Sequence, residues 1–292
     1  MEFRLLSSDA DSDMMRQLMA TLPDGPTVLD FEEVIQLASV RENTRLWFDA
    51  DTLAAFAYVD DYNNLCFEIS PTYSSPELEA QVVDWGVECM HRRNQQAEEP
   101  ANLDASCRAS DHALVRMFTE NGFELLPERS LRYSRSLQEP IPPCPLPEGF
   151  RLRTANGTSE VKALVALHRA AFDSDQMTVQ YRLAMMNAPQ YAPDMDWLIV
   201  APDNSLAAFC IGGLEEDDPS EGYLDPVGVH PAYHGKGLGS AIMTAGLIEL
   251  QKRGLRQVNL GTSSQNQAMQ ALARKMGFQL VSESLWFTKK VN

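Results

Sequence analysis

The chain has 292 residues, of which 44% are hydrophobic, and this length and composition accommodate two ordinary domains, each with its own core. Its formal net charge of −17 argues against nucleic acid and anionic membrane surfaces as partners, and no apolar run reaches membrane-spanning length. Five cysteines without short spacings and five scattered histidines predict neither a disulfide framework nor a metal site.

The first half of the chain predicts a sheet flanked by helices. Its start, Met1-Glu2-Phe3-Arg4, lacks the apolar core of a secretion signal, so we expect a cytoplasmic protein. The helix predicted over 76–93 begins with Pro76-Glu77-Leu78-Glu79, without glycine and with two carboxylates in its first turn. Periodicity predicts the other elements as strands near 3–6, 44–49, 52–59, 64–70 and 102–107, and helices over 9–20, 30–39 and 111–120.

A proline-rich segment, 138–148, follows this half. Its five prolines disfavour a helix or a paired strand and predict a stiff, extended connector. We therefore expect a first domain over 1–137 and a second over 149–292.

The second half repeats the order of elements of the first. The segment Asn266 to Phe278 aligns without a gap with Asp111 to Phe123, and both end in Gly-Phe, so the sequence predicts an internal repeat. Its predicted elements are strands near 150–153, 195–201, 206–212, 223–229 and 256–261, and helices over 158–171, 178–187, 238–253 and 266–276.

A glycine-rich turn between a strand and a helix is the clearest functional motif. The strand ends in Val227-Gly228-Val229, and the turn and helix start read His234-Gly235-Lys236-Gly237-Leu238-Gly239-Ser240. Glycines without Cβ atoms, followed by the free N–H groups of a first helical turn, predict a site for a phosphate group. The spacing fits neither a Walker P-loop nor a dinucleotide-binding fingerprint.

The turn resembles the acyl-CoA loop of the GCN5-related N-acetyltransferases (GNAT), with His234 in place of the usual Arg or Gln. The resemblance implies an α/β (α+β) chain of two tandem GNAT folds, each a mixed, mostly antiparallel sheet flanked by helices. It implies acetyl-CoA as co-substrate, held by the turn and by backbone groups of Val227, Gly228 and Val229. Asn266, which begins the second signature, is implied as a ligand of the pantetheine arm, or is a plain helix cap. The first half, without the glycine turn, is expected to be a degenerate copy.

The resemblance also implies direct attack of a primary amine on the thioester. Asp225 is the first candidate for the base that deprotonates the amine, and Tyr223 is the second; a purely structural carboxylate is the alternative for Asp225. Ala273 stands where the family commonly has a tyrosine that protonates the departing thiolate, so we assign no general acid. The connection 172–177 is expected to select the acceptor.

The sequence thus predicts an acyl-CoA-dependent N-acyltransferase acting on a small-molecule amine, as a monomer or a homodimer. The alternatives are a non-catalytic acyl-CoA sensor, which Ala273 favours, and a scaffold, which the intact glycine turn disfavours. Met177, Tyr181, Tyr191 and Trp197 either line an acceptor pocket or belong to the core.

Overall fold

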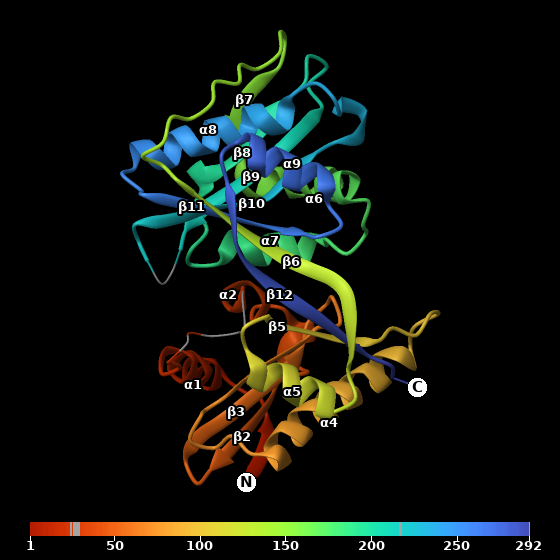
Figure 1. Ribbon diagram of the computed structural model, residues 1–292. Coiled ribbons are helices and arrows are strands. Elements are labelled where there is room, and N and C mark those ends of the chain that lie inside the picture. The colour runs from red at the N-terminus through yellow and green to blue at the C-terminus, as the bar shows by residue number, and fades with distance from the viewer. Residues whose placement is uncertain (24, 26–29, 216–217, 292) are drawn as a thin grey trace. The chain divides into compact units, whose positions relative to one another are not determined.

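The computed structural model describes residues 1–23, 25, 30–215 and 218–291, and these form two compact units (Figure 1). The first unit comprises Met1–Glu128 and Ser284–Asn292, and the second Arg129–Glu283. Each has sheet strands and covering helices, which confirms the expected α/β fold class.

The first unit contains a four-stranded antiparallel sheet in the order β1-β2-β3-β4. Its core gathers large side chains, among them Trp47, Trp85, Phe118 and Phe287. The helix predicted over 30–39 is two short helices, because Leu37 between them adopts an extended backbone. The elements are β1 (Glu2–Leu5), α1 (Asp9–Ala20), α2 (Phe31–Val34), α3 (Ala38–Arg41), β2 (Arg45–Asp49), β3 (Thr52–Val59), β4 (Leu65–Ile69), α4 (Pro76–Asn94), β5 (Leu103–Arg108), α5 (His112–Glu120) and β6 (Glu124–Ser136).

The second unit contains strands in the order β6-β11-β10-β9-β8-β7; among its described residues, β10 and β11 pair in parallel and the other neighbours are antiparallel. Its elements are β7 (Arg151–Thr154), η1 (Gly157–Glu160), α6 (Val161–Phe172), α7 (Val179–Asn187), η2 (Pro193–Met195), β8 (Asp196–Val200), β9 (Leu206–Leu214), β10 (Glu221–Val229), η3 (Pro231–Tyr233), α8 (Leu238–Lys252), β11 (Gln257–Ser263), α9 (Gln267–Lys275) and β12 (Gln279–Lys289).

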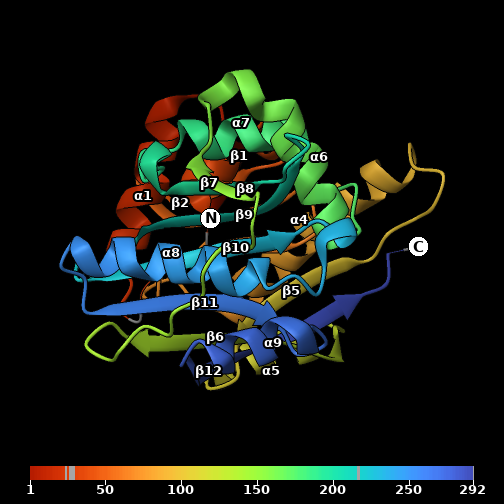
Figure 2. The same cartoon turned by 90° about the horizontal axis from the view of Figure 1, so that it is seen from above.

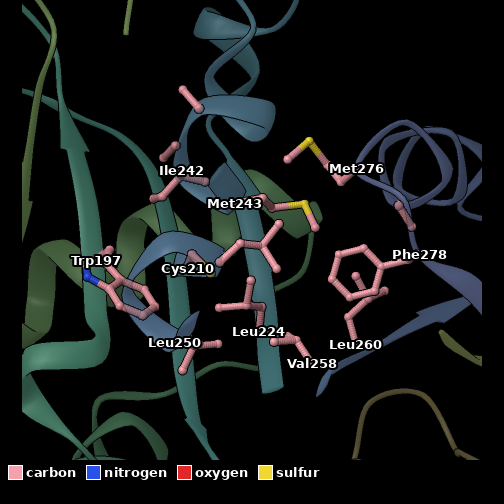
Figure 3. Close-up of a cluster of buried hydrophobic side chains, with 14 of the residues drawn as sticks. Trp197, Cys210, Leu224, Ile242, Met243, Leu250, Val258, Leu260, Met276 and Phe278 are labelled. Carbon is pink, nitrogen blue, oxygen red and sulfur yellow. The ribbon is translucent and has the colours of Figure 1, made fainter. Parts of the chain in front are cut away.

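Helices cover both faces of this second sheet. Helix α8 packs on β8, β9 and β10, and its axis lies in about the same direction as these strands (Figure 2). Its Ile242 and Met243 pack with Trp197, Cys210 and Leu224 in the main core (Figure 3). On the other face of the sheet, α6 packs on Leu198 of β8 and Phe209 of β9, which lie opposite each other in the two strands. The periodicity of two along the strands therefore divides the side chains between two helix layers.

The last strand of each half continues from one unit into the other: residues 124–128 of β6 belong to the first unit, and residues 279–283 of β12 belong to the second. Residues 130–136 of β6 pair with 257–263 of β11 in the second unit, and residues 284–289 of β12 pair with 103–108 of β5 in the first. The units therefore differ in their limits from the expected domains 1–137 and 149–292. The expected connector, 138–148, falls within the second unit.

This proline-rich segment lies against helix α8. Gln251 Nε2 donates to the carbonyl of Leu137 at 2.6 Å, and Thr244 Oγ1 donates to the carbonyl of Pro142 at 3.2 Å. Ile141, Cys144 and Leu146 pack on the core of the unit. The prolines make the segment extended, and these contacts attach it to the helix.

Candidate functional site: an anion cradle beside an open strand edge

The glycine turn before α8 has the conformation that its sequence demands. Gly235 and Gly237 have φ of +75° and +78°, and a Cβ at either position would meet no atom within 4 Å. The turn therefore needs glycine for its backbone angles, and open space lies beside it. Gly237 is the N-cap of α8.

The start of α8 carries a row of free donors. Within the described residues, the backbone N–H groups of 235–240 donate no hydrogen bond, and the first bond of the helix runs from Ala241 N to Gly237 O at 3.0 Å. These donors add to the positive end of the helix dipole, so the turn suits a phosphate group.

Residues 235–240, the glycine turn and the first turn of α8, are called the cradle. Three side chains lie around it. His234 is exposed, and its Nε2 is 3.0 Å from the carbonyl of Val229, so it fixes the turn to the end of β10. Lys236 is exposed within the turn. Lys275, at the end of α9, donates from Nζ to Ser240 Oγ at 3.0 Å and brings a second cation to the cradle. No sequence pattern predicts Lys275 at this site, because its position depends on the packing of α9 beside α8.

Strand β10 separates from β11 just before the cradle. The two strands pair only over Glu221–Tyr223 and Gln257–Asn259, whereas pairing of β10 with β9 continues to Val229, with a register shift between Leu224 and Val227. In the described chain, the strand pairing of β10 with β11 ends at Tyr223, so the β11-facing edge of Val227–Val229 has no strand partner. An open edge of this kind can pair with an extended ligand as an added strand would.

Val227, Gly228 and Val229 lie along this open stretch. Gly228 also has a packing role: a Cβ there would lie 2.3 Å from the ring of Phe209 and 2.9 Å from Ala171. Glycine at 228 thus lets α6 and β9 approach the strand closely.

The two candidate bases lie on one face of β10, near the point of separation. Asp225 is exposed, and its Oδ2 accepts from the backbone N–H of Gly261 on β11 at 3.1 Å. Tyr223 is half-buried, and its ring lies on Gly213, where a Cβ would come within 2.3 Å of the ring. Asp225 therefore keeps an exposed carboxylate oriented beside the open edge.

The remaining predicted residues have structural roles as well. Asn266 caps α9, because its Oδ1 accepts from Met269 N at 3.0 Å, and its Nδ2 makes no hydrogen bond within the described residues. Ala273 is fully buried in the core, so it offers no group to a leaving thiolate.

In the first unit, the N-terminus of α4, which corresponds to that of α8, is capped by a side chain. Ser75 caps α4 by accepting from Leu78 N at 3.3 Å, and Glu77 and Glu79 occupy the first turn. The side-chain cap and the two carboxylates replace the free donors found at α8.

A buried polar group lies between α7 and β8. Arg182 forms an ion pair with Asp196, and Tyr191 Oη donates to Asp196 Oδ2 at 2.7 Å. Arg182 also lines a cavity of about 10 Å³ together with Met177 and His168. Of the predicted pocket residues, Met177 therefore lines a cavity, whereas Trp197 belongs to the core. The sequence of β8, Asp-Trp-Leu-Ile-Val, has no alternation of polar and apolar residues from which this ion pair could be predicted.

In the part of the chain that the structure describes, no three side chains of the metal-binding types converge on one point. None of the described helices is long and apolar enough to cross a membrane.

Comparisons with known proteins agree with this geometry. Residues 161–278 match the model of the acetyltransferase (GNAT) family. A mycothiol acetyltransferase of Thermobispora bispora is 30% identical over 247 residues, which cover 80% of this chain and 79% of that protein. Another of the same name, from Salinispora arenicola, is 35% identical over 151 residues, or 49% of each chain.

A solved structure of a tandem GNAT protein from the clavulanic acid biosynthesis pathway has a similar fold. It superposes with a TM-score of 0.70 at 14% identity and covers 100% of this chain and 98% of that one.

Proposed function

Because the chain belongs to the GNAT acetyltransferase family and is an N-acetyltransferase, we propose that its second unit transfers the acetyl group of acetyl-CoA directly to a primary amine of a small molecule. The observation that carries the proposal is the row of free N–H donors at 235–240 beside the open edge of β10. The relatives named mycothiol acetyltransferase support a small-molecule acceptor.

The backbone donors of the cradle would hold the diphosphate, with Lys236 and Lys275 adding positive charge. The open edge of Val227, Gly228 and Val229 would pair with the pantetheine arm, and the free Nδ2 of Asn266 is a further donor to it. A backbone N–H on this edge would polarise the thioester carbonyl.

Asp225 would take a proton from the acceptor ammonium, directly or through water, because an alkyl ammonium has a pKa near 10 and cannot attack while protonated. Tyr223 is the second candidate. The C–N bond forms, the C–S bond breaks, and the thiolate leaves. Because the thiol of CoA has a pKa near 8.5, its thiolate can leave without a proton donor in place of Ala273, and solvent can then protonate it.

The test combines calorimetry with a thiol-release assay over a panel of amines. We expect one CoA bound per chain and amine-dependent release of thiol. Binding without release would support the sensor alternative that Ala273 favours, and the absence of both would contradict the proposal.

The base is tested with Asp225→Asn, which retains an oxygen for the Gly261 N–H. We expect turnover to fall by roughly 100-fold, with the greater loss at low pH, and CoA affinity to stay unchanged. Glu249→Gln on α8 is the matched control. An unchanged pH–rate profile would remove Asp225 from this role.

A further inference from the structure

One face of the second sheet carries adjacent rows of polar side chains. In the middle row, Tyr223 pairs with Asn259, and Asn259 pairs with Ser134. Register partners point to the same face of a sheet, so these three side chains lie together. The flanking rows are Glu221 with Gln257 and Ser136 on one side, and Gly261 with Arg132 on the other.

This face lies opposite the main core. The alternate residues Leu224, Val258 and Leu260 point into the core under α8. The polar rows therefore belong to the same side of the sheet as Asp225, whose carboxylate accepts from Gly261 N. We call the side chains of Glu215, Glu221, Asn259, Gln257 and Ser134 the polar face.

Two carboxylates of the polar face are fixed close together. Glu215 Oε1 and Glu221 Oε2 lie 2.8 Å and 3.0 Å from the same atom, Asn259 Nδ2. Gln257 Nε2 donates to the other oxygen of Glu221 at 2.9 Å, and Arg132 Nη2 lies 2.9 Å from Glu215 Oε1. The amides are neutral and Arg132 offsets one charge, so the pair retains negative charge and favours a cation.

A buried hydroxyl on the same face lacks a partner. Ser134 is 8% exposed, lies opposite Asn259, and its Oγ makes no hydrogen bond within the described residues. Buried polar atoms of this kind are rare, and each needs an explanation such as a ligand. The hydroxyl can accept a hydrogen bond from an ammonium group held by the two carboxylates once the side chains that cover it move aside.

We propose that the polar face binds a second ammonium group of the acceptor, so that the acceptor is a dicationic, extended amine. Glu221 and Asp225 are four residues apart on β10, which places their backbones roughly 13 Å apart along an extended strand. One ammonium is held by Glu215 and Glu221 while the other reaches Asp225 for acetylation. The inference rests on the proposed function for the identity of the reacting end.

The first test measures binding alone, by calorimetry of the full chain with a linear eight-carbon diamine and with the eight-carbon monoamine. We expect the diamine to bind at least about fivefold more tightly, and Glu221→Gln or Glu215→Gln to remove that advantage without changing monoamine affinity. Glu249→Gln, on the opposite layer of the unit, is the control and keeps the advantage. Equal affinity of the two amines, or an advantage that survives both substitutions, overturns the inference.

The second test separates this inference from the proposed function. Unfolding temperature and CoA affinity are measured for each variant, so a misfolded protein is recognised. If the diamine binds in a Glu221-dependent way but releases no thiol, binding of an ammonium group by the polar face is supported and the proposed function is contradicted. If thiol is released and Glu221→Gln leaves the KM of the diamine unchanged, the proposed function stands and this inference fails.

Discussion

His168 on α6 is a half-buried side chain whose charge state affects stability. Its ring packs on Phe172 and Phe209, and its Nδ1 has no hydrogen-bond partner in the described part of the chain. Burial, with a smaller contribution from the charge of Arg182, lowers the pKa of His168 to about 4.

This shift predicts a loss of stability in mild acid. The unfolded chain, with a histidine pKa near 6.5, binds more protons than the folded one between pH 6.5 and 4, so the free energy of unfolding falls as the pH falls through that window. At pH 5 the loss is about 1 kcal/mol after allowance for partial exposure. Urea unfolding at pH 7.5 and pH 5 should show this loss in the wild type and a smaller one in His168→Leu; equal losses would contradict it.

Single residues of the cradle could be predicted because their requirement is local. Gly235 and Gly237 adopt the positive φ that glycine favours, and His234 lies at the turn. Their role in binding stays a prediction. Lys275 and the Arg182–Asp196 pair could not be predicted, because each contact joins elements whose packing the sequence does not reveal.

At the scale of elements, the start of α8 differs from the start of α4 in what it can bind. We expect Gly237→Glu to abolish CoA binding, because it places a carboxylate among the free donors and a side chain at φ +78°. Gly254→Glu is the matched control, since Gly254 follows the other end of α8 with φ +84° and open space around it.

Calorimetry with CoA compares the two variants. Both should lose similar stability, and only Gly237→Glu should lose affinity, by more than about 100-fold. Wild-type affinity in Gly237→Glu, or an equal loss in Gly254→Glu, would argue against the cradle as the phosphate site.

Most elements could be predicted from periodicity, and the fold class is confirmed by the structure and its GNAT neighbours. The single helix predicted over 30–39 was wrong, since apolar spacing does not report the extended Leu37. The family resemblance implied free backbone groups at Val227, Gly228 and Val229, but the point where β10 and β11 stop pairing is set by the packing of two distant strands and was not predicted.

At the scale of the whole molecule, the exchange of terminal strands decides which fragments can fold. Residues 149–292 lack β6, whose Leu131 and Tyr133 are buried in the core of the second unit, together with Leu137 just after it. Burial of one large apolar side chain stabilises by roughly 1.5–3 kcal/mol, so the three together approach the ~5–15 kcal/mol stability of a domain.

We therefore expect 149–292 to aggregate, and 129–283, which keeps β6 beside β11, to fold and bind CoA. Gel filtration, circular dichroism and calorimetry of the two fragments provide the check. A folded, CoA-binding 149–292 would show that the exchanged strand is dispensable. The sequence suggested a division at the prolines, because composition marks a connector but does not report which sheet a strand joins.

The exchange also sets an order of events during synthesis on the ribosome. The edge of β5 that receives β12 emerges before all of the second unit, and its partner strand emerges after it. At about 5–20 residues per second, the nascent first unit waits on the order of ten seconds or more with that edge uncovered. The amino-terminal half, which lacks the glycine turn, is thus the part of the newborn chain whose sheet edge waits for a strand from the end of the sequence.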